Sequence, residues 1–232
     1  MRRWDDEGRG NYQDFEVLKN SAMNLQTMHD GSIILAGYLP DIGRYSSNGQ
    51  EIFYKEGETM VFTNGRRVQY YSANYDGTKI SFKSGKLQPM TFSVTDRLLQ
   101  QSNEIYDKSR DSYNSLKVTN WNSKFDPKIN GKNQTFLSNR EYCRSVDIAD
   151  NGTIIIGADW GVYALDSSGQ IKWKAKEVPG VAWSVKATSD MKTVVAAHGG
   201  GEFRWYRMQD GRQLLSLFVH PDGKRWIMWS PE

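Results

Sequence analysis

The sequence lacks several features that mark common classes of protein. Its 232 residues include a single cysteine, Cys143, so no disulfide can form within the chain and nothing points to an oxidising compartment. No run of about 18 apolar residues occurs, which excludes a membrane-spanning helix. Residues 1–17 carry positive charge but lack the apolar segment of a secretory signal. We therefore expect a soluble, cytoplasmic protein.

An excess of charge of one sign is also lacking. The chain has 30 basic and 27 acidic residues, and the basic ones are spread along its length. Nucleic-acid binding usually needs a concentrated basic face, so we expect no nucleic-acid partner. The three histidines are isolated, and Cys143 has no partner at the spacing of metal ligands. Since no phosphate-binding glycine loop occurs either, the sequence predicts no metal and no cofactor.

Helical periodicity is scarce, and short apolar runs separated by turn residues take its place. The runs are rich in β-branched and aromatic residues, as at 153–156, 193–195 and 203–206. Asn-Gly and Asp-Gly pairs between them tolerate positive φ and favour tight hairpins. Only residues 95–101 have any helical character. The sequence predicts an all-β chain.

The chain also contains an internal repeat. Residues 144–156 align with residues 183–195 at a constant offset of 39 residues, and residues 25–54 show the same order of runs and turns. Four strands in about 40 residues is the period of a β-propeller blade, which needs neighbouring blades to cover its faces. We therefore predict a β-propeller of WD-repeat type, and a β-sandwich is the alternative.

The predicted propeller is incomplete or small, with about four to five blades of four antiparallel strands. The segment at 96–115 is polar and without period, so we expect a long surface loop there. The first and last residues both fall within a blade. The predicted single domain, 1–232, divides into a partial blade 1–19, a blade 22–57, an irregular blade 66–137 with the long loop 96–115, a blade 142–177, a blade 181–219 and a partial strand 224–232.

Three segments in the second half of the chain resemble a known family. They are WNSKFDPKINGK (121–132), YCRSVDIADNGTIIIGADWGVYALDSSGQIKW (142–173) and the segment 178–232, which contains VPGVAW and DGKRWIMWSPE. They resemble the C-terminal WD-repeat region of large bacterial proteins, which often carry a caspase-like peptidase domain elsewhere. The resemblance implies a propeller that is truncated at both ends relative to the family. No peptidase domain is present in these residues, so the resemblance implies no peptidase activity.

Two short strings resemble catalytic motifs. Cys143-Arg144 echoes a caspase nucleophile, but a catalytic cysteine needs a neighbouring base, and a buried strand position favours an inert thiol. The HGGG string at 198–201 matches an esterase oxyanion loop, which has meaning only beside a G-x-S-x-G elbow that this sequence lacks. We expect these glycines to form a turn between strands. Trp173 follows a D-x-x-G turn and is expected to pack between blades.

The leading prediction is a non-catalytic scaffold that mediates protein–protein interaction with a partner of unknown identity. Rigid blades can carry variable loops, and large aromatics and Arg are enriched at binding hot spots. Each candidate could equally pack inside the fold, and packing is favoured for Trp183. The candidate contact residues are Arg144, Asp159, Trp160, Trp183 and His198.

Two alternatives remain open at this point. A quinoprotein-like or other ligand-binding or enzymatic propeller would need polar side chains converging from several blades. Asp147 is replaced by Lys186 one repeat later, so no polar residue recurs at that position and a small-molecule ligand is not expected. The other alternative is a truncated fragment of a larger WD-repeat signalling protein.

Overall fold

The chain folds into two compact units, Met1–Thr59 and Met60–Glu232, where a single domain was predicted. The structure is a computed structural model, and each unit is described by itself. Strands and turns make up the described residues of both units, and none of those residues is helical, which confirms the all-β prediction. No helix among them is long and apolar enough to cross a membrane. The described residues are 1–19, 21–37, 41–58, 60, 62, 71–83, 87–176 and 178–231.

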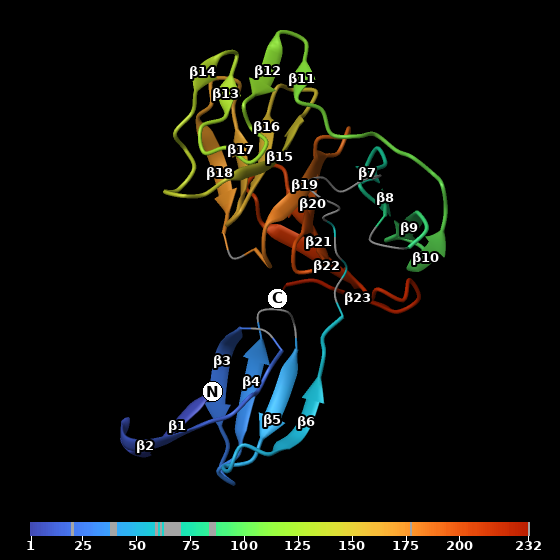
Figure 1. The fold of residues 1–232 in the computed structure, drawn as a ribbon. Coiled ribbons are helices and arrows are strands. Elements are labelled where there is room, and N and C mark those ends of the chain that lie inside the picture. The colour runs from blue at the N-terminus through green and yellow to red at the C-terminus, as the bar shows by residue number, and fades with distance from the viewer. Residues whose placement is uncertain are drawn as a thin grey trace. The chain divides into compact units, whose positions relative to one another are not determined.

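The first unit consists of a hairpin and a four-stranded antiparallel sheet (Figure 1). A small cluster of Leu18, Leu35 and Tyr45 forms its buried core. The partial blade expected at 1–19 is represented by the hairpin, and residues 15–18 form no strand. The strands of this unit are β1 (Arg2–Asp6), β2 (Arg9–Asp14), β3 (Ala22–Thr27), β4 (Ile33–Gly37), β5 (Ile42–Tyr45) and β6 (Glu51–Lys55).

Among its described residues, the second unit contains four antiparallel sheets, each built from strands that follow one another in the chain (Figure 1). The first two sheets consist of β7 (Ser72–Ala73), β8 (Lys79–Phe82), β9 (Met90–Ser93) and β10 (Leu98–Gln101), and of β11 (Ser112–Tyr113), β12 (Leu116–Thr119), β13 (Lys128–Ile129) and β14 (Lys132–Asn133). The other two consist of β15 (Cys143–Ile148), β16 (Ile154–Ala158), β17 (Val162–Leu165) and β18 (Ile171–Ala175), and of β19 (Ala182–Ala187), β20 (Thr193–His198), β21 (Glu202–Arg207), β22 (Gln213–Val219) and β23 (Trp226–Trp229).

The turn after the first strand is the same in four sheets. Gly31, Gly77, Gly152 and Met191 all have positive φ and donate their backbone N–H to the carbonyl three residues earlier. The Asp or Asn before each of them accepts the N–H two residues further on. These side chains hold the chain in the reversal that a tight hairpin requires. Turn chemistry therefore sets where the first strand of each of these four sheets ends. This includes the turn at Asp76-Gly77, whose copy of the repeat the sequence did not reveal.

The four sheets of the second unit pack face to face. The sheets β11–β14 and β15–β18 share one apolar cluster, β15–β18 and β19–β23 share a second, and β19–β23 and β7–β10 share a third. Two indoles reinforce these contacts, because Trp173 donates its Nε1–H to the Met208 carbonyl at 2.7 Å and Trp205 to the Gly77 carbonyl at 2.8 Å. Stacked four-stranded sheets of this kind are the blades of a β-propeller. The predicted fold class is confirmed, and Trp173 joins two blades as expected.

Three local predictions differ from the structure. The region 66–137 contains two sheets where one irregular blade was expected, and β10 and β11 lie inside the predicted loop 96–115. Because β10 is an edge strand with largely exposed side chains, its sequence does not alternate between apolar and polar residues. The weak helical character at 95–101 was therefore misleading. The partial strand predicted at 224–232 is β23, which pairs with β22 as a fifth strand instead of opening a new sheet. Residues 66–70 lie outside the described residues.

Candidate binding site at the inner strands

The candidate site begins with an ion pair at the start of β15. Arg144 Nε lies 2.6 Å from Asp159 Oδ1, and both side chains are largely buried. Arg144 also donates to the Ser123 hydroxyl at 3.0 Å, and Asp159 accepts the backbone N–H of Tyr142 at 3.1 Å. Because Asp159 directly follows β16, the pair ties two neighbouring strand ends together. The Arg144 guanidinium is thus fixed in one orientation.

Aromatic rings flank this guanidinium. Its Cζ lies 4.8 Å from the ring centroid of Tyr142 and 5.2 Å from that of Trp183, within the range of cation–π attraction. Trp183 belongs to β19 in the next sheet, so the contact joins two blades.

A Cβ atom on Gly199 would lie 3.1 Å from the Trp183 Nε1, and one on Gly200 only 2.4 Å from the Pro179 carbonyl oxygen. The glycines of the HGGG string therefore allow the backbone to lie this close to Trp183 and Pro179. This close packing explains why the turn at 198–201 consists of glycines.

His198 lies beneath the surface, contrary to its prediction as a contact residue. Its side chain is fully buried, its Nδ1 lies 3.2 Å from the Gly180 carbonyl oxygen, and its Nε2 lies 3.0 Å from the Tyr206 hydroxyl. Burial lowers the pKa of His198 to about 3. The imidazole is therefore neutral at physiological pH and acts as a hydrogen-bonding core residue at the end of β20.

Trp160 is the exposed member of the predicted set. Its side chain is 52% exposed, in the turn between β16 and β17. Its backbone N–H donates to the buried carboxylate of Glu141 at 3.2 Å. Glu141 also accepts the Tyr163 hydroxyl at 2.6 Å and the Ser138 N–H at 2.9 Å, with the Lys174 ammonium 3.6 Å away. Although burial acts to raise the pKa of Glu141, these partners outweigh it and lower the pKa.

A second buried ion pair joins two inner strands near their C-terminal ends. Asp147 of β15 and Lys186 of β19 lie 3.3 Å apart, and both are almost completely buried. Asp147 also accepts the backbone N–H groups of Arg110 and Ala187 at 2.8 and 2.7 Å. Burial raises the pKa of the Asp147 carboxyl, and Lys186 and the two N–H groups oppose it. The change from Asp147 to Lys186 at equivalent repeat positions, which suggested a lack of convergent polar groups, instead creates a contact between blades.

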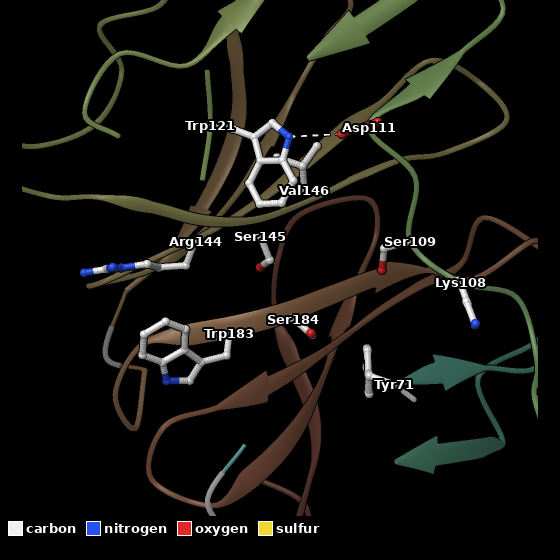
Figure 2. Close-up of a pocket in the computed structure, with 10 residues that line it drawn as sticks. All are labelled: Tyr71, Lys108, Ser109, Asp111, Trp121, Arg144, Ser145, Val146, Trp183 and Ser184. Atoms are coloured by element: carbon white, nitrogen blue, oxygen red, sulfur yellow. Dashed lines mark hydrogen bonds between the residues drawn. The ribbon is translucent and has the colours of Figure 1, made fainter. Parts of the chain in front are cut away.

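A cavity of about 320 Å³ opens beside these inner strands (Figure 2). Its lining comes from the strands β15 and β19, from the segment 102–111, and from Tyr71 and Trp121, which lie just outside β7 and β12. Arg144 and Trp183 are the two predicted residues that line it, and the repeat relates them to each other, as it relates Ser145 to Ser184. The lining consists of Tyr71, Lys108, Ser109, Asp111, Trp121, Arg144, Ser145, Val146, Trp183 and Ser184.

Within the described part of the chain, neither the thiol nor the acidic side chains form a recognisable reaction centre. Cys143 is buried, and burial raises the pKa of its thiol, which disfavours the thiolate that a nucleophile requires. Among the described residues, no group of three or more His, Cys, Asp or Glu side chains could hold a metal ion. The cavity instead offers hydrogen-bonding groups, one aspartate, two cationic side chains and aromatic rings.

Comparison with known proteins adds little to this geometry. No family model matches the chain, and no curated protein matches it. Among solved structures, it is similar to the β-propeller domain of Cps50 (Swd1) from Myceliophteria thermophila, with 8% identity and a TM-score of 0.36. That match covers 82% of this chain and 67% of the other. At this level of similarity, the fold assignment depends on the sheets themselves.

Proposed function

We propose that this chain is a non-catalytic, WD-repeat-like propeller scaffold that binds a protein partner through its rim cluster, defined as Arg144, Asp159, Trp160 and Trp183. One observation carries the proposal. An exposed Trp160 directly follows Asp159, whose ion pair with Arg144 fixes a guanidinium against Trp183. Trp and Arg dominate binding hot spots, and their contribution is largest where the side chains are held in place beforehand.

The packing beneath the rim cluster supports a scaffold role. The side chains of β16 and β17 are fully buried, and those of β20 nearly so, so the strand ends that carry the cluster sit on a close-packed base. Turns on such a base can change in sequence without disturbing the strands. The resemblance of residues 115–232 to the WD-repeat region of bacterial proteins points the same way, and we extend the proposal to a cytoplasmic assembly with one protein partner.

The test is a quantitative binding experiment. The tagged chain captures proteins from its native host, and each candidate identified by mass spectrometry is purified and titrated against it by calorimetry. Trp160→Ala is expected to weaken binding by about 30-fold, as for a hot spot worth about 2 kcal/mol. The backbone N–H that binds Glu141 is retained in this variant, so the fold is unaffected.

Tyr75→Ala is the matched control, because Tyr75 is another exposed aromatic residue, 66% exposed, in the turn between β7 and β8. It is expected to bind the partner like the wild type. Equal affinities of the wild type, Trp160→Ala and Tyr75→Ala for every purified candidate would exclude the rim cluster as the partner site.

A further inference from the structure

The cavity at the inner strands contains a polar atom that the fold leaves unsatisfied. The Tyr71 hydroxyl is buried and has no hydrogen-bond partner among the described residues. Tyr71 itself is only 5% exposed, and it lines the cavity (Figure 2). Buried hydroxyls without a partner are rare in native proteins because leaving one unpaired costs free energy. Because the hydroxyl itself is closed off from solvent, a molecule in the cavity would supply the missing acceptor once the lining beside Tyr71 shifts.

The Tyr71 ring is held in position. It stacks on Phe203 with ring centroids 6.0 Å apart and an interplanar angle of 13°. Burial raises the pKa of the phenol well above its ordinary value, with a smaller contribution from the Asp147 carboxylate. The hydroxyl therefore keeps its proton at physiological pH and is a fixed hydrogen-bond donor.

Other donors of the cavity are also unpartnered. Among the described residues, the exposed Lys108 ammonium forms no ion pair, and the half-buried Ser184 and Trp183 side chains donate no hydrogen bond. By contrast, the single acidic residue of the lining, Asp111, already accepts the Trp121 Nε1–H at 3.2 Å. The surplus of donors, with one unpaired cation, matches a ligand group that only accepts hydrogen bonds and carries one negative charge.

The position of Lys108 is fixed by its neighbours in the segment 102–111. The Asp107 carbonyl accepts the Ala73 N–H at 3.4 Å, and the Ser109 hydroxyl donates to the Val185 carbonyl. The Arg110 N–H donates to Asp147 at 2.8 Å. This segment is therefore bound to the inner strands of three sheets, so Lys108 stands beside the cavity without a cost for ordering its backbone.

We propose that the cavity binds an organic carboxylate of about the size of one aromatic residue. The carboxylate accepts hydrogen bonds from Tyr71 and Lys108, and an aromatic or apolar group packs against Trp121, Val146 and Trp183. A volume of about 320 Å³ lies within the range of ligand pockets, roughly 300–1,000 Å³. The carboxylate could belong to a free small molecule or to the C-terminal residue of a peptide. The cavity shares Arg144 and Trp183 with the rim cluster but does not include its exposed Trp160, and the carboxylate proposal does not depend on the proposed function.

The probes are phenylacetate, a short peptide that ends in a free Phe carboxylate, and the amide counterpart of each. Binding is measured by saturation-transfer NMR and by tryptophan fluorescence on the full chain. At least one carboxylate is expected to bind saturably, and its amide about tenfold more weakly, because the amide loses the charge that Lys108 complements. Binding of phenylacetate alone assigns a free small molecule, and binding of the peptide assigns a chain terminus. No saturable binding of either carboxylate at millimolar concentration overturns the proposal.

Tyr71→Phe is the decisive variant because it removes only the hydroxyl oxygen. Carboxylate binding is expected to fall about tenfold, while the melting temperature without ligand stays the same or rises, since the unpaired hydroxyl is gone. Lys108→Gln is expected to weaken binding similarly, and Trp160→Ala to leave it unchanged. A lower melting temperature of Tyr71→Phe, with unchanged binding, would mean that the hydroxyl serves the fold through water and would overturn the proposal. Loss of partner binding in Trp160→Ala has no bearing on this result.

Discussion

The sheet β3–β6 of the first unit and the sheet β15–β18 of the second share one local pattern but differ in their burial. Their first turns form the same hydrogen bonds, at Gly31 and Gly152. Every side chain of β16 is buried, whereas β4, at the equivalent place, has one buried residue among five. All six residues of β3 are exposed, including Met23 and Leu25. Strand pattern and turn chemistry are therefore sufficient to form the four-stranded sheet of a blade. They do not determine how deeply the side chains of its strands are buried.

The neighbouring sheet determines this burial. Within the second unit, β15–β18 packs between β11–β14 and β19–β23, and its apolar residues belong to two shared clusters. A single inner-strand position illustrates the difference. Gln26 of β3 is exposed, while its equivalents Asp147 and Lys186 are buried and paired with each other. A blade gains its stability from contacts that its own repeat does not contain.

The largest expected effect comes from breaking the pair between blades. Asp147→Ala leaves the Lys186 ammonium buried without a counter-charge and two backbone N–H groups without an acceptor. We expect a loss of about 3–5 kcal/mol in the free energy of unfolding, measured by urea denaturation with tryptophan fluorescence. Gln26→Ala, at the same repeat position, is the control and should leave the far-UV circular dichroism transition unchanged. A loss below about 1 kcal/mol for Asp147→Ala would contradict the interpretation of this pair.

A smaller effect is expected from a turn that touches a neighbouring sheet. Gly211 has φ +73°, and a Cβ atom there would lie 2.5 Å from the ring of Trp173 in the adjacent blade. Gly152 has φ +79° and open space around the same position. Gly152→Ala should lose about 1 kcal/mol from backbone strain alone, and Gly211→Ala about 2–3 kcal/mol because the Trp173 contact must also shift. Equal losses in thermal or urea unfolding would show that the contact between sheets adds nothing.

The last expected effect, similar in size to that of Gly211→Ala, is a pH dependence that arises from His198, which occupies the position of Asp159 one repeat later. Burial lowers the pKa of His198 to about 3, below the ordinary value of 6.5. Between these values the unfolded chain binds a proton that the folded chain does not, so stability is complete above pH 6.5 and falls as the pH decreases. From pH 7.5 to pH 5 this amounts to about 2 kcal/mol. His198→Gln should remove this decrease in the free energy of unfolding between pH 7.5 and pH 5, measured by urea denaturation at the two pH values. An unchanged decrease would contradict a buried neutral imidazole.

The sequence was sufficient for the parts of the fold that recur at fixed spacing. The offset between 144–156 and 183–195 predicted two blades, because turn residues and apolar runs act locally. The edge strands β10 and β23 were misjudged, since an edge strand need not alternate in polarity and its pairing is decided elsewhere in the chain. The division into two units was also missed, because it depends on which blades contact each other.

The candidate site was predictable in part for the same reason. Arg144 and Trp183 lie at equivalent ends of two inner strands and Asp159 follows the strand next to Arg144, where the repeat suggested candidate contacts, and the structure brings these three together. Tyr71 lies in a copy of the repeat that the sequence did not reveal, and Lys108 lies in a segment without a repeat counterpart, so no spacing pointed to them. The pairing of Asp147 with Lys186 could not be predicted, because it depends on the two copies of the repeat facing each other in the fold.

Hydrogen–deuterium exchange on the intact chain tests most directly whether neighbouring sheets, and not strand pattern, determine the stability of a blade. Both β4 and β16 have paired backbone amides in four-stranded sheets, so the comparison isolates the effect of packing. We predict that peptides covering β16 and β20 exchange only through global unfolding of the second unit, while those covering β4 exchange much faster through local opening. Equal protection of β4 and β16 would contradict this explanation.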